Sequence, residues 1–160
     1  MTDSIEIIKK YQLREPVDVV ALANDLGMKV WTSQKLSDEI SGKLFQDINL
    51  GGDAGYAIVV NGKHPEVRRR FTIAHEVAHF LLHRKEVGAG ISDNQFYRSN
   101  LSNKQETEAN KLAADILMPR KLINTIKEKN YLDDSDTKAL AKALNVSEVA
   151  MKIRLGINYD

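Results

Sequence analysis

Apolar residues follow two kinds of spacing along the chain, and each kind predicts a different element. Near the N-terminus, helical spacing predicts a short helix over residues 5–13 and a second helix from Pro16 to Leu26, which Gly27 ends. Three short apolar runs bounded by turn residues follow at strand spacing, at Met28–Thr32, Ile40–Ile48 and Tyr56–Val60. We therefore expect a small sheet of about three strands, mostly antiparallel.

After the predicted sheet the spacing is helical almost throughout. A long helix is expected over residues 65–83 and another over residues 103–118, where Pro119 stops it. Between them, residues 85–102 are rich in Gly, Ser and Asn and predict a loop long enough to form the rim or lid of a cleft. Three shorter helices complete the pattern, one after Pro119 and two at 135–144 and 147–155.

The composition is that of an ordinary globular protein. The 160 residues are 42% hydrophobic and 28% charged, which fits one domain made of an N-terminal part (1–62), a central helical part (63–119) and a C-terminal helical part (120–160). The net charge of +1 gives no indication of a nucleic-acid or acidic partner.

Cysteine is absent, which excludes disulfides and thiolate metal ligands and fits a reducing compartment. The first residues lack the basic and apolar regions of a signal peptide, and no apolar run approaches the length of a membrane span. We expect a cytoplasmic protein without membrane contact.

The most informative residues lie in the middle of the first long helix. His75 and His79 are four positions apart, so a helix places both imidazoles on one face, where they can bind the same Zn²⁺ ion. Glu76 lies beside the first histidine, where its carboxylate can take a proton from a water on the metal. A chance HExxH match usually lies on a polar surface helix, whereas the neighbours here are apolar, which favours a real metal site.

A catalytic zinc site usually has three protein ligands and one open position, so a third ligand is needed. Glu106 and Glu108 on the second long helix are the candidates. Glu106 shares its face with Ala109, Asn110, Ala113, Ile116 and Leu117, whereas Glu108 shares its face with Lys104, Lys111 and Asp115. We assign Glu106 as the ligand because it is the carboxylate on the apolar face, although an acid in a first turn can also serve the helix dipole. Asn110 can orient a ligand from one turn away, or simply satisfy a buried backbone group.

These two helices resemble the ImmA/IrrE family of zinc metallopeptidases. Residues 69–82 and 106–119 are similar to the family pattern RRFTxAHExxH followed by ExxANxFAAxLLMP. Leu112 and Ile116 depart from it, but both are apolar replacements that leave the polar positions unchanged. Residues 16–27 and 146–155 are similar to the family's terminal segments, so the resemblance covers most of the chain.

We expect an α+β fold in which the small sheet packs on a zincin-like helical core. At the C-terminus, residues 140–150 resemble a helix-turn-helix, with Ser147 as the N-cap of the second helix. The family resemblance implies His75, His79 and Glu106 as ligands of Zn²⁺ and Glu76 as the catalytic carboxylate. It also implies a zinc-dependent endopeptidase that acts as an anti-repressor. Its expected substrate is a helix-turn-helix repressor of a phage, mobile element or stress regulon, and this expectation is analogy alone.

Two other functions stay open. A zinc-binding regulator or toxin of a two-gene switch would keep the three ligands but would not need Glu76. DNA binding through residues 140–155 is disfavoured because Lys152 and Arg154 share the second helix with Glu148, which leaves a thin basic face. His64, Tyr97 and Arg98 are open candidates for stabilising an oxyanion, and we interpret His83 as a structural residue near a helix C-terminus. The oligomeric state is not predicted.

Overall fold

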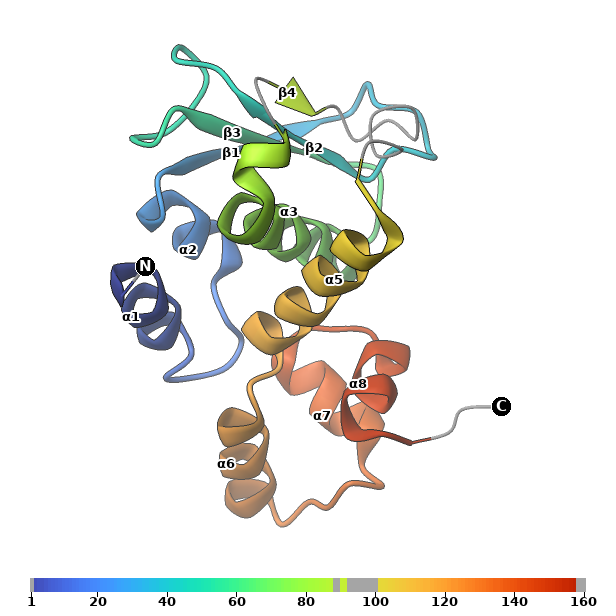
Figure 1. Cartoon of the computed structure of the whole chain (residues 1–160). Coiled ribbons are helices and arrows are strands. Elements are labelled where there is room, and N and C mark those ends of the chain that lie inside the picture. The colour runs from blue at the N-terminus through green and yellow to red at the C-terminus, as the bar shows by residue number, and fades with distance from the viewer. Residues whose placement is uncertain (1, 88–89, 92–100, 158–160) are drawn as a thin grey trace.

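The computed structural model describes residues 2–87, 90–91 and 101–157 (Figure 1). Its helices are α1 (Thr2–Tyr11), α2 (Val19–Asp25), α3 (Glu66–Val87), α5 (Asn103–Leu117), α6 (Arg120–Asn130), α7 (Thr137–Leu144) and α8 (Glu148–Leu155). Its strands are β1 (Met28–Ser33), β2 (Gly42–Gln46), β3 (Tyr56–Asn61) and the two-residue β4 (Gly90–Ile91). This arrangement is the predicted α+β fold.

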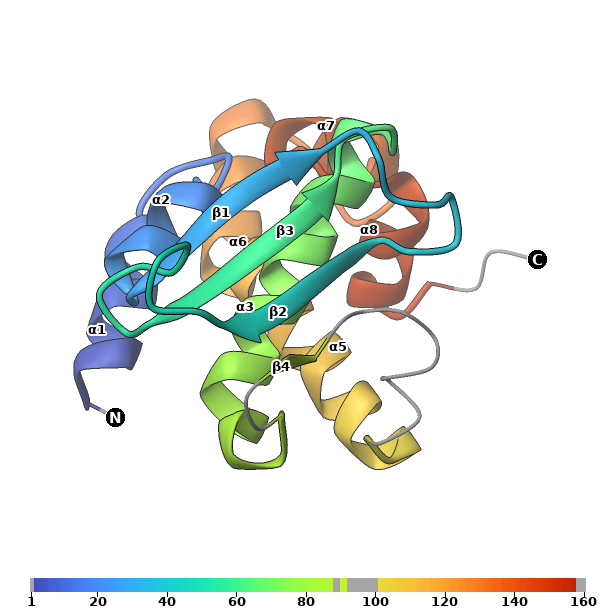
Figure 2. The same cartoon turned by 90° about the horizontal axis from the view of Figure 1, so that it is seen from above.

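The four strands form a single sheet in the order β1–β3–β2–β4. Strand β2 is antiparallel to both β3 and β4, as expected, but β1 and β3 are parallel, with Met28 opposite Tyr56. The sheet is therefore mixed, because β2 lies on the far side of β3 and reverses the chain before β3 returns beside β1. Seen from above, the sheet lies in front and the helices lie behind it, so the described elements form two layers (Figure 2).

The connection from α2 into β1 shows how local sequence sets the first elements. The side chain of Asp18 accepts a hydrogen bond from the Ala21 amide (3.0 Å), so α2 begins after this cap and not at Pro16 as predicted. Gly27 follows the helix with a φ of +102°, a conformation that favours glycine, and a Cβ there would lie 2.7 Å from the Cβ of Ala54. The predicted role of Gly27 as the end of the helix is confirmed.

Helix α3 is the centre of the fold. Every residue from Thr72 to Phe80 is buried, since one side of the helix packs on β2 and β3 and another packs on α5. The helix kinks at His83, whose φ of −128° and ψ of 20° are not helical, and continues to Val87. It is thus longer than the predicted range of 65–83, and Gly90–Ile91 form β4 inside the predicted loop, most of which lies outside the described residues.

The C-terminal helices are joined to the centre by two arginines. Arg154 on α8 donates from Nε to the carbonyl oxygen of Met118 (2.8 Å) and forms an ion pair with Asp115 on α5 (2.6 Å). Arg70 on α3 donates to the carbonyl oxygens of Leu144 and Asn145 at the end of α7 (3.3 and 3.0 Å), which suits the negative end of a helix. Burial lowers the pKa of Arg70 from its usual value.

Among the described helices, none is long and apolar enough to cross a bilayer.

Candidate metal centre

Two imidazoles face each other on the buried side of α3. The Nε2 atoms of His75 and His79 are 3.0 Å apart, and the two side chains are 7% and 3% exposed. Their rings meet edge to face with centroids 4.5 Å apart. The four-residue spacing therefore brings both nitrogens to one point, as a helix requires.

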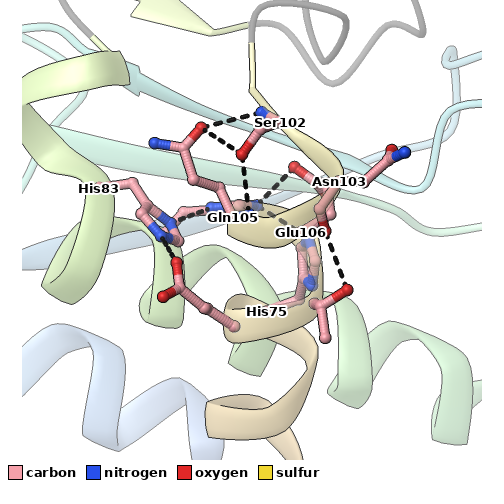
Figure 3. Close-up of polar contacts among 9 residues, drawn as sticks. His75, His83, Ser102, Asn103, Gln105 and Glu106 are labelled. Atoms are coloured by element: carbon pink, nitrogen blue, oxygen red, sulfur yellow. Dashed lines mark hydrogen bonds and ion pairs between the residues drawn. The ribbon is translucent and has the colours of Figure 1, made fainter.

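Helix α5 brings a carboxylate to the same point. The Oε1 atom of Glu106 lies 3.2 Å from Nε2 of His75, and its Oε2 atom lies 3.1 Å from Nε2 of His79. The helix end is capped by other residues: Ser102 accepts from the Gln105 amide, and Gln105 accepts from the Ser102 amide (Figure 3). Capping is therefore not the role of Glu106, whose carboxylate faces the two histidines.

The donor set fits a divalent metal ion. One nitrogen of each histidine and one oxygen of Glu106 lie within 4.8 Å of one another. The two imidazole nitrogens are 3.0 Å apart, and each lies 3.1–3.2 Å from a different oxygen of Glu106. These distances are near the separation of about 3.3 Å between donors bound tetrahedrally at about 2.0–2.1 Å from zinc. A hydrogen atom on one imidazole can be shared with only one acceptor. A cation, in contrast, can bind the lone pairs of both imidazole nitrogens and of the carboxylate oxygen at once.

Glu76 is buried immediately after His75 on α3. A carboxylate in the apolar centre of a protein is costly unless it has a partner or a function. Its position next to His75 is the one that the sequence predicted for a catalytic carboxylate. Its chemical role stays a prediction.

The other sequence candidates are not part of the cluster of three donors, and two of them lie outside the described part of the chain. Asn110 is exposed, whereas Ala109, Ala113, Ile116 and Leu117 of the same predicted face are buried. Its orienting role stays a prediction. His64 is buried with its Nε2 atom 2.9 Å from the carbonyl oxygen of Asp38. Tyr97 and Arg98 lie outside the described residues.

Sequence reasoning missed the part of His83 and Glu108 in this region. His83 is buried, and its Nδ1 atom lies 3.0 Å from Nδ1 of His79. Its Nε2 atom lies 3.0 Å from Oε1 of Glu108. The sequence pattern groups Glu108 with the charged face of Lys104, Lys111 and Asp115, but its carboxylate contacts this buried histidine. The spacing His75–His79–His83 was a visible signal, since three histidines at intervals of four share one helical face.

An apolar groove of about 770 Å³ runs along α3, α5 and α8. Phe71 and Asn110 line it, and each lies one helical turn along its helix from His75 or Glu106, so this end of the groove is about one turn from the donors. Among the described residues that line it, none is acidic. The basic side chains on the lining are those of Arg68, Lys111, Arg120 and Arg154.

The contacts of the C-terminal helices bear on DNA binding. Ser147 caps α8 by accepting from the Ala150 amide (3.0 Å), as the helix-turn-helix-like pattern predicted. However, the guanidinium of Arg154 is held by Asp115 and the Met118 carbonyl, so one of the two basic residues of this helix points into the protein. This arrangement favours a packing or substrate-contacting role for the helix pair.

Comparisons with known proteins agree with this geometry. The peptidase family described as IrrE N-terminal-like domain matches residues 23–156. A comparison with curated proteins finds no match. A solved Mycobacterium tuberculosis transcriptional regulator is similar in fold, with a TM-score of 0.64 at 18% identity; the match covers 98% of this chain and 46% of that one, so this chain spans about half its length. Because the family match includes both helices of the donor cluster, the chain belongs to the IrrE N-terminal-like family of peptidases.

Proposed function

We propose that the protein is a zinc-dependent endopeptidase that cleaves a specific protein substrate. The observation that carries the proposal is the convergence of His75, His79 and Glu106, three donors of the types that zinc prefers, from two packed helices. The proposed set matches a catalytic site because three protein ligands leave one position for water. Membership of a metallopeptidase-type family supports the same chemistry.

In this proposal His75, His79 and Glu106 would hold the zinc ion, and Glu76 has a separate task. The ion, when bound, would lower the pKa of a water molecule and polarise the scissile carbonyl group. The carboxylate of Glu76 accepts the proton that the attacking water releases and passes it to the nitrogen of the leaving peptide. The buried surroundings of Glu76 exclude bulk water, which strengthens its electrostatic interaction with charge that develops nearby.

The groove beside the three donors supports a polypeptide substrate. Its volume of about 770 Å³ accommodates several side chains, and its lining is mainly apolar with basic residues. We propose that a segment of a helix-turn-helix repressor binds there, and that the enzyme relieves repression in the cytoplasm by cutting it. The choice of a repressor as substrate rests on the family resemblance, whereas the groove supports a polypeptide substrate.

The test is the Glu76→Gln variant, which keeps the shape of the side chain and removes the base. We expect this variant to bind zinc and fold like the wild type, and to lose cleavage of the repressor encoded beside its gene. Glu128→Gln, which makes the same change at an exposed position of α6, serves as the matched control and should cleave normally. If Glu76→Gln keeps full biological activity, the peptidase proposal fails and a zinc-binding regulator takes its place.

A further inference from the structure

A chain of side-chain contacts leads from the three donors to the protein surface. Nδ1 of His79 contacts Nδ1 of His83 at 3.0 Å, and Nε2 of His83 contacts Oε1 of Glu108 at 3.0 Å. The side chain of His83 is only 5% exposed, whereas that of Glu108 is 45% exposed. In Figure 3, the side chain of His83 extends from α3 toward the first turn of α5.

When a cation occupies the position that Nε2 of His79 faces, the chemistry of the three side chains sets the direction of these hydrogen bonds. An ionised carboxylate only accepts, so Glu108 accepts from the Nε2–H group of His83. A neutral imidazole has one donor and one acceptor, so Nδ1 of His83 must then accept from the Nδ1–H group of His79. This leaves the lone pair of His79 on Nε2, the atom that faces His75 and Glu106.

We propose that His83 and Glu108 are positioning residues that hold His79 in its metal-binding tautomer and ring orientation. The inference rests on the proposed metal centre and adds two residues that do not belong to the set of three donors. Metal-bound histidines commonly donate their second N–H group to an acceptor, which fixes the tautomer and makes the ring a stronger ligand. Here a second imidazole is that acceptor, and a carboxylate on another helix sets its tautomer in turn.

Two features of the fold fit this chain of hydrogen bonds from Glu108 through His83 to His79, which we call the relay. Helix α3 kinks at His83, so the backbone leaves helical geometry at the residue whose ring connects α3 to α5. On α5, Glu106 contacts His75 and His79 while Glu108, two residues later, contacts His83. One turn of α5 therefore supplies both the proposed ligand and the carboxylate that orients another ligand.

A purely structural role for the pair makes a different prediction. Buried polar atoms need partners, and a contact between His83 and Glu108 would meet that need without affecting the metal. Loss of such a contact would lower stability but would leave the tautomer of His79 and the metal affinity unchanged. The relay requires both of these properties to change.

The first measurement uses metal-free protein and reads the tautomer directly. Side-chain ¹⁵N NMR of wild type should show His79 with its proton mainly on Nδ1, although the carboxylate of Glu106, 3.1 Å from Nε2, competes for that proton. In Glu108→Ala and in His83→Phe, the proton of His79 should be shared between Nδ1 and Nε2. Glu86→Ala is the matched control, because Glu86 is exposed on α3 and lines the same surface depression as His83 and Glu108. This control should leave the His79 signals unchanged.

The second measurement is zinc affinity, obtained by competition with a chelator on the full chain. Glu108→Ala and His83→Phe should bind zinc about 10- to 100-fold more weakly than Glu86→Ala, the range found when residues that orient metal ligands are lost. His83→Gln offers an amide oxygen that can accept from His79, so it should recover part of the affinity lost in His83→Phe.

The outcomes separate this inference from the proposed function. If Glu108→Ala keeps both the wild-type tautomer of His79 and the wild-type zinc affinity, the relay is wrong even when the peptidase proposal holds. If wild type binds no zinc, the peptidase proposal fails, while the NMR measurement still decides the relay. Because Glu108 is half exposed, its truncation should not unfold the protein, so a misfolded His83 variant leaves the test intact.

Discussion

Replacing Glu106 by alanine tests the proposed third ligand through thermal stability. Zinc that binds only the folded chain at 100 times its dissociation constant stabilises it by about 2.7 kcal/mol. For a chain of this size each kcal/mol moves the melting temperature by about 2–4 °C, so wild type should gain about 5–11 °C. Glu106 is one of three donors within 4.8 Å, and losing a donor should weaken the site at least 100-fold. The zinc-dependent gain of Glu106→Ala then falls to about 0.4 kcal/mol, or about 1–2 °C.

The assay is thermal unfolding by circular dichroism with EDTA and with zinc. The melting temperature of each variant in EDTA serves as its own reference, so the zinc-dependent gain is compared separately from any stability that the truncation itself costs. Glu128→Ala on α6 is the control and should keep the full zinc-dependent gain. A gain of wild-type size in Glu106→Ala would refute the assignment, because the third donor would then be another group.

Three further predictions concern packing, the groove and pH. Arg154→Ala should lower the free energy of unfolding by about 2–3 kcal/mol in urea titrations, because it removes a charge-assisted bond to the Met118 carbonyl and an ion pair; a loss below about 0.5 kcal/mol would contradict this. Ile153→Glu, at an exposed position on the groove, should raise KM for the repressor far more than it lowers kcat, and an unchanged KM would remove the groove from substrate binding. Hydrogen bonds from Lys10 and then Tyr11 lower the pKa of Asp25. Wild type should therefore be more stable than Asp25→Asn above the ordinary carboxyl pKa, and this difference should vanish as pH falls through the lowered pKa. Unfolding curves recorded at a series of acidic pH values would show it.

The parts of the site that follow local rules could be predicted from sequence. His75 and His79 share a face because of the helical period, and the apolar neighbours predicted that this face is buried. On α5, Glu106 lies on the predicted apolar face and Glu108 on the charged face, which is why Glu106 was predicted as the third ligand. The structure brings the carboxylate of Glu106 to both imidazoles. Each of these inferences depends on residues within a few turns of one helix.

Features that depend on packing between distant segments could not be predicted. The parallel pairing of β1 with β3 is set by how the chain passes around β2, which no local spacing encodes. Asn110 was placed on the apolar face, but the groove beside α5 leaves it exposed. The contact between His83 and Glu108 joins residues 25 positions apart, and it depends on the kink that separates His83 from the regular helix.

The central claim is that one zinc ion binds between α3 and α5 on His75, His79 and Glu106. The most direct measurement is elemental analysis of the purified, dialysed protein beside its His79→Ala variant. We expect about one zinc per wild-type chain and almost none in the variant. Wild type without zinc after loading, or a His79→Ala variant that holds as much zinc as wild type, would contradict it.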